Sequence, residues 1–280
     1  MKPRRAFDKQ LFSVEIKLPS GKRKRIQELN NKQYLTIIKY CENEDYRGLS
    51  LFFDDLYLSK DLDIFDRLYT LIYVRMIFVN DCLSFNTKEN REVDISLSIV
   101  LDKLEQNYTN LNKRVEHDNI VIDLGLPTCL YFETIEDIFN NVIQKITINN
   151  ESIDFISLSD NDKKAIQDNL PTTIFKKLKA YIDSLSENLL DIEVIESNET
   201  LGISEIKLSI IGNGVMQFIA MIYGNNLRSF YEFIYAFYAH ITNGSDVFFD
   251  ISPVESKILL NIHNKRIQEE NKELKKQNSQ

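Results

Sequence analysis

The stretch that decides the fold is residues 63–79, DIFDRLYTLIYVRMIFV. Apolar side chains recur there at helical spacing and occupy nearly the whole circumference of the predicted helix. A helix that is apolar on all sides must be surrounded by other elements, so we expect this segment at the centre of the core. The apolar set comprises Leu68, Leu71, Ile72, Val74, Met76, Ile77 and Val79.

Two short strands and two helices are predicted ahead of this segment. Residues 11–18 alternate apolar and polar side chains, which is typical of a half-buried strand. Residues 19–22 predict a turn, and 23–26 then form the second strand of a hairpin. A helix capped by an asparagine is predicted over 30–43, and another over 46–58.

The middle third of the chain has a different pattern, because β-branched residues there alternate with polar ones. Strands are predicted within 94–101, 119–124 and 143–157, with a short helix over 134–142. The pattern favours helices again from residue 159 onward.

The final helix has the clearest start signal in the chain. Ser252 is the predicted N-cap, Pro253 takes the first helical position, and Glu255 completes a capping box. The whole pattern predicts a helix-rich α+β protein with an N-terminal β-hairpin and a small β-containing middle region. Three regions are expected: 1–90 with the hairpin and helices, 91–200 with the strands, and 201–280 with an extended terminal helix.

Composition excludes several classes of function. The net charge of −8 argues against a general nucleic-acid binder. The most apolar run, 215–223, is shorter than the roughly 20 residues that span a bilayer, and no signal peptide is present, so no membrane association is expected. The three cysteines, Cys41, Cys82 and Cys129, are expected to be buried, reduced thiols of a cytosolic protein.

No residue pattern predicts catalysis. The three histidines lie outside any nucleophile motif, and no cluster has the spacing of metal ligands. The sequence GNG at 212–214 lacks the third glycine of a dinucleotide fingerprint, which favours a strand-to-helix turn. We therefore expect a protein that is not an enzyme and that holds no cofactor and no metal.

The basic run 22–25, KRKR, can be interpreted in several ways. Charges on a strand edge discourage pairing between sheets, and this is the favoured interpretation, ahead of contact with an acidic partner. A regulatory adaptor that touches nucleic acid through this hairpin is the alternative function. An enzyme with an acidic, ion-binding site ranks below it.

An aromatic run at 230–238, FYEFIYAFY, occupies most of a helical circumference. Either the helix is fully enclosed, which is the more common outcome, or one face is a protein interface. Arg228 and Glu232 have the spacing of an i,i+4 pair. In the last helix, Leu260, Ile267 and Leu274 recur every seven residues, but this spacing alone is too weak for an autonomous coiled coil.

Two parts of the sequence carry a family resemblance. VEIKLPSGK at 14–22 and ELNNKQYL at 28–35 resemble the start of baseplate hub and hub-assembly proteins of T-even-type contractile-tailed phages. IYGNNLRSFYE at 222–232 and SPVE at 252–255 look like the C-terminal region of the same proteins.

The resemblance implies a non-enzymatic phage tail protein that acts in baseplate hub assembly, as an assembly factor (chaperone) or a minor hub subunit. Its partners would be other hub and tail proteins, in the host cytoplasm during assembly and in the virion baseplate. The helices at 228–238 and 257–274 are the expected contact surfaces. The residues expected to bind partners are Arg228, Phe230, Tyr231, Tyr235, Tyr238, Ile262, Ile267 and Leu274.

Overall fold

The computed structural model describes residues 12–86, 92–108, 113–189, 191–194, 204–224, 227–241 and 247–277. Helix α3 (Ile64–Phe78) lies at its centre, where it packs against α4 (Leu97–Asn107) and α8 (Gly214–Tyr223). Side chains of α3 are buried around the circumference, and even Asp66 and Thr70 are inaccessible to solvent. The central position predicted for this helix is confirmed.

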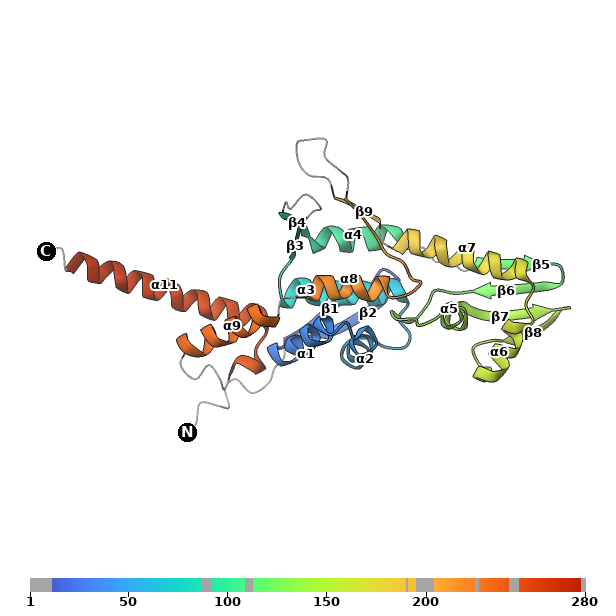
Figure 1. Ribbon diagram of the computed structural model, residues 1–280, viewed down its shortest axis with the longest axis horizontal. Coiled ribbons are helices and arrows are strands. Elements are labelled where there is room, and N and C mark those ends of the chain that lie inside the picture. The colour runs from blue at the N-terminus through green and yellow to red at the C-terminus, as the bar shows by residue number, and fades with distance from the viewer. Residues whose placement is uncertain are drawn as a thin grey trace.

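The remaining elements form an elongated molecule (Figure 1). Strands β5–β8 and helices α5–α7 lie at one end, α1–α4 and α8 form the middle, and α11 extends from the other end. The other helices are α1 (Asn31–Glu42), α2 (Tyr46–Leu56), α5 (Ile135–Val142), α6 (Asp160–Asp168), α7 (Thr172–Leu189), α9 (Leu227–His240), the 3₁₀ turn η2 (Phe248–Asp250) and α11 (Pro253–Gln277).

Every strand pair in the described residues is antiparallel and joins neighbours in sequence. Three are separate two-stranded pairs, and one sheet has four strands in the order β5-β6-β7-β8. The pairs are β1 (Ser13–Lys17) with β2 (Arg23–Gln27), β3 (Cys82–Asn86) with β4 (Glu92–Ser96), and β9 (Asp191–Val194) with β10 (Ser204–Lys207). The larger sheet comprises β5 (Lys113–His117), β6 (Ile120–Leu124), β7 (Ile143–Ile148) and β8 (Glu151–Asp154).

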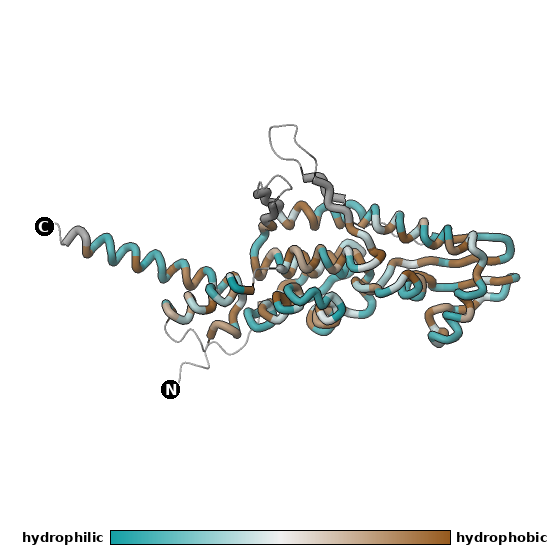
Figure 2. Tube along the Cα trace, viewed as in Figure 1, coloured by the Kyte–Doolittle hydropathy of each residue, from teal (hydrophilic) through white to brown (hydrophobic). Residues whose placement is uncertain are grey.

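This architecture confirms the α+β prediction. Hydropathy along the chain agrees with it, since the central helices carry long apolar runs while α11 is mostly hydrophilic (Figure 2). The division into three regions stays a prediction.

One predicted strand is wrong over part of its length. The segment 94–101 was expected to be extended, yet α4 begins at Leu97. The Ser96 side chain accepts a hydrogen bond from the amide of Ser98, so Ser96 caps the helix. Leu97, Val100 and Leu104 are buried at helical spacing, a period that the short alternation at 94–99 obscured. Strands β3 and β5 were not predicted.

Three hydrogen bonds between distant residues attach the end of α8 to the core. Arg75 on α3 donates from Nε to the carbonyl of Ile222 at 2.6 Å. The Tyr223 hydroxyl donates to the carbonyl of Leu71 at 2.6 Å, and the Tyr34 hydroxyl donates to the carbonyl of Tyr223 at 3.4 Å. Burial raises the pKa of the Tyr223 phenol well above its usual range, so Tyr223 stays a neutral donor.

Replacement of Arg75 by alanine is expected to lower the free energy of unfolding by about 1.5–3 kcal/mol, because buried carbonyls lose a charged donor. Arg266→Ala is the matched control. Its guanidinium is exposed and pairs with Glu270 on the same helix, so a change within about 0.5 kcal/mol is expected. Urea denaturation measures both values. Equal losses in the two variants would contradict the role assigned to Arg75.

Asp63 caps α3 and also has a perturbed pKa. Its side chain accepts a hydrogen bond from the amide of Asp66 at 3.0 Å. Burial raises the pKa of the Asp63 carboxyl to about 6, and the nearby Asp66 carboxylate adds to this increase. The folded state therefore binds more protons than the unfolded chain between the two pKa values, and this contribution to stability falls as the pH rises through that window.

Asp63→Asn should remove this pH dependence and keep the cap, because asparagine caps helices as well as aspartate does. The stability of the variant relative to the wild type should increase between about pH 4 and pH 6, by at most ~1.4 kcal/mol per pH unit. Urea denaturation across that range measures it. Asp45→Asn, at the exposed N-cap of α2, controls for the lost charge at a helix end. Parallel profiles for Asp63→Asn and the wild type would contradict the assignment.

Candidate partner-binding surface

Helix α9 has one buried and one exposed aromatic face. Phe230, Ile234 and Phe237 are buried at i, i+4 and i+7. The residue that follows each of them faces outward: Tyr231, Tyr235 and Tyr238 are 47%, 77% and 37% exposed. The sequence favoured a fully enclosed helix, but in the described residues one face of α9 is exposed. Phenylalanine marks the inner face and tyrosine the outer face, a distinction that the sequence already contained.

Phe230 was expected to bind partners, and the structure corrects this expectation. Its side chain is 3% exposed and makes an edge-on contact with Tyr34, with ring centroids 5.5 Å apart. It also contacts Phe248, which is fully buried and touches Phe237 and Tyr238 as well. Phe230 therefore belongs to the core of the chain, and Phe248 organises a cluster that the sequence analysis missed.

The start of α11 is positioned by α1. Asn31, which is fully buried, donates from its side chain to the carbonyl of Phe248 at 2.8 Å and to the Ser256 hydroxyl at 3.3 Å. The predicted capping box is confirmed: the Ser252 amide donates to the Glu255 carboxylate at 3.0 Å, and the Glu255 amide donates to the Ser252 hydroxyl at 3.2 Å. These contacts fix the direction in which α11 leaves the body.

Helix α11 carries exposed apolar side chains along its length. In Figure 2, hydrophobic positions recur along this mostly hydrophilic helix. Ile262, Ile267 and Leu274, all predicted partner residues, are 60%, 36% and 55% exposed, and Ile258 and Leu259 are exposed beside them. The helix touches α9, and the rings of His240 and His263 lie 5.5 Å apart. Leu274 lies roughly 16 Å further along the axis, at 1.5 Å per residue.

The structure thus brings the two predicted surfaces onto neighbouring helices. Arg228 forms the predicted pair with Glu232, at 3.0 Å, on the exposed side of α9. Seven of the eight predicted partner residues are exposed or half-exposed, and Phe230 is the exception. Their role in binding stays a prediction.

The described residues hold no group of three or more histidine, cysteine, aspartate or glutamate side chains that could bind a metal ion. None of the described helices has the length and apolarity needed to cross a membrane. The three cysteines form no disulfide in the described residues and are half-buried, rather than fully buried as expected. Burial raises the pKa of the Cys41 thiol to about 12, so this side chain is not a nucleophile at neutral pH.

The basic hairpin forms ion pairs and hydrogen bonds within the chain. Lys22 lies 3.4 Å from the Asp61 carboxylate, Arg23 lies 3.3 Å from Glu15, and Arg25 donates to the Ser13 hydroxyl at 2.7 Å. Strand β2 is an edge strand, because its sheet has two strands in the described residues. Because three of the four basic groups are engaged, the hairpin gives little support to a nucleic-acid function.

Comparison with known proteins gives one match. The T4 bacteriophage base plate protein family matches over residues 11–211, which includes the N-terminal motifs of the resemblance and ends before α8. No curated protein and no solved structure matches the chain. The family match covers more than half of the sequence, and the chain belongs to the T4 bacteriophage base plate protein family.

Proposed function

We propose that this baseplate protein acts in assembly of the baseplate hub, as an assembly factor or a minor hub subunit, by binding other tail proteins through the outer face of α9 and the apolar side chains of α11. The observation that supports this proposal is the row of exposed tyrosines at positions 231, 235 and 238. Tyrosines are enriched at protein interfaces, because the ring buries apolar area while the hydroxyl stays hydrogen-bonded.

The geometry of α9 suits a binding element. Its inner face is anchored through Phe230 and Phe237 to the cluster around Phe248. A rigid support lowers the entropy that side chains lose when a partner binds. The family match ends at residue 211, so support for this surface comes from the structure.

The double variant Tyr231→Ser, Tyr235→Ser should keep its fold and lose binding to hub and tail proteins. One hot-spot tyrosine contributes about 2 kcal/mol, which is roughly a 30-fold change in Kd. Affinity purification of the tagged chain from infected cells, with mass spectrometry of the recovered hub and tail proteins, measures the loss. Thermal unfolding checks that the variant is folded.

Two control variants make the outcome specific. Ile156→Ser removes an exposed apolar side chain that follows β8 and should leave recovery unchanged, because β8 lies at the end of the molecule opposite α11 (Figure 1). Phe230→Ala should lower stability by about 3–5 kcal/mol, as expected for a core position. Undiminished recovery with the double tyrosine variant would refute the proposed surface. Abundance of the chain in purified virions distinguishes a subunit, which is retained, from an assembly factor, which is not.

A further inference from the structure

Among the described residues, the outer edge of β2 has backbone groups without partners. Along the hairpin, hydrogen-bonded pairs include Phe12 with Glu28 and Leu18 with Lys22, each at 2.8 Å. Hydrogen-bonded and non-bonded pairs alternate in an antiparallel ladder, so the backbone groups of Arg25 and Gln27 point away from β1. Within the described residues, β2 pairs with β1 alone, and no hydrogen bond is recorded for these outward groups.

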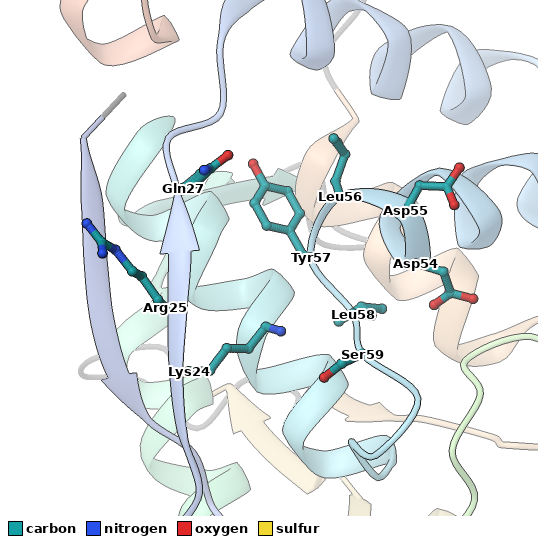
Figure 3. A pocket seen from close by; sticks show the side chains of 9 residues that line it. All are labelled: Lys24, Arg25, Gln27, Asp54, Asp55, Leu56, Tyr57, Leu58 and Ser59. Carbon is teal, nitrogen blue, oxygen red and sulfur yellow. The ribbon is translucent and has the colours of Figure 1, made fainter. Parts of the chain in front are cut away.

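A slot of about 430 Å³ adjoins this edge. Lys24, Arg25 and Gln27 line one side, and Asp54 and Asp55 at the end of α2 with residues 56–59 line the other. The carboxylates of Asp54 and Asp55 point away from β2 (Figure 3). The side chains of Lys24 and Tyr57 lie in the gap between β2 and this segment, with the Tyr57 hydroxyl toward Gln27. The volume falls within the ~300–1,000 Å³ typical of ligand sites.

Two polar groups in the slot lack partners among the described residues. The Tyr57 residue is only 5% exposed, and its hydroxyl is buried without a hydrogen bond. Lys24 forms no recorded hydrogen bond or ion pair, and burial lowers the pKa of its ammonium group, an effect that the nearby Asp61 opposes. Buried polar groups in folded proteins are normally hydrogen-bonded, so the unmatched Tyr57 hydroxyl, with the half-buried Lys24 beside it, indicates a missing partner.

The unmatched groups share one chemistry. The Lys24 ammonium, the Tyr57 hydroxyl and the outward amides of Arg25 and Gln27 can all donate hydrogen bonds. An occupant must therefore supply acceptors, and the positive charge of Lys24 favours a carboxylate. The unpaired strand edge favours an extended backbone over a compact ligand.

We propose that this slot binds an extended, acidic segment of another protein, which pairs with β2 as a third strand and places a carboxylate against Lys24 and Tyr57. Lys24 and Ile26 lie on the same face of the sheet. If the added strand runs antiparallel to β2, its residues opposite Ile26 and Lys24 lie on that face too, and the one opposite Ile26 comes first in its sequence. Ile26 is buried, so the motif is an apolar residue followed two positions later by an acidic one. The proposal is independent of the α9 and α11 surface.

Amide hydrogen exchange of the full chain, followed by NMR, tests the pairing directly. The probe is a capped peptide of sequence TTVEETT, and the control peptide is TTVKKTT. In the free protein the amides of Arg25 and Gln27 should exchange quickly, while those of Lys24 and Ile26 are protected by β1. The acidic peptide should slow exchange at Arg25 and Gln27 at least tenfold, and the basic peptide should not.

Variants separate edge pairing from general attraction between charges. Gln27→Pro removes an outward amide without a change of charge, and proline is tolerated at such edge positions, so peptide affinity should fall at least tenfold. Ser13→Pro is the matched control, because it removes an outward amide from β1, also without a change of charge, and should leave affinity unchanged. Lys24→Met keeps the backbone intact and should weaken binding of the acidic peptide, which provides a test if the proline variant fails to fold.

Three outcomes would overturn the proposal. Equal protection by both peptides would show that charge plays no part. Absence of protection by the acidic peptide would show that the edge does not accept a strand. Slow exchange of Arg25 and Gln27 in the free protein would show that the chain itself already occupies the edge.

Discussion

The attachment of α8 to α3 is the constraint on which the rest of the structure depends. Helix α8 also packs on α1 and α2, so it closes the helical core formed by residues from the first third of the chain. Arg75 and Tyr223 fix the register of that closure through buried hydrogen bonds to main-chain carbonyls. Because a buried carbonyl without a donor is costly, few alternative placements of α8 are compatible with these partners.

The C-terminal helices take their positions from this closure. Helix α9 follows α8 directly and packs on α1, and α1 also holds the start of α11 through Asn31. Both elements of the candidate surface thus depend on the same N-terminal helix. A chain that places α8 and α1 correctly has therefore largely fixed where its exposed tyrosines lie.

Sequence patterns predicted the elements whose signals are local. The apolar circumference of α3, the capping box of α11 and the pair of Arg228 with Glu232 each depend on residues a few positions apart. The face of α9 that is buried depends instead on Phe248, which lies in a segment with no periodic pattern. Phe230 was misassigned for that reason, although the alternation of phenylalanine and tyrosine was available to distinguish the faces.

The slot beside β2 was beyond sequence reasoning for a related reason. Lys24 and Tyr57 come from different elements, and nothing in the basic run 22–25, to which Lys24 belongs, indicates that Tyr57 lies beside it. Their shared lack of a hydrogen-bond partner exists only in three dimensions. At the start of α4 a local pattern gave the wrong prediction. The alternation of apolar and polar residues at 94–99 predicted a strand, whereas the buried face of the helix continues beyond these residues.

The projection of α11 gives the two parts of the candidate surface different mechanical properties. Contact with α9 includes His263, after which every side chain described as far as Leu274 is exposed. An isolated helical segment of that length is marginally stable in water, so the outer part of α11 should open and close locally with little cost. A partner that holds this part must also order it, and some of the binding energy is lost to that ordering. A partner bound to the outer part of α11 should therefore dissociate readily, whereas a partner bound to α9 contacts a helix that is already rigid.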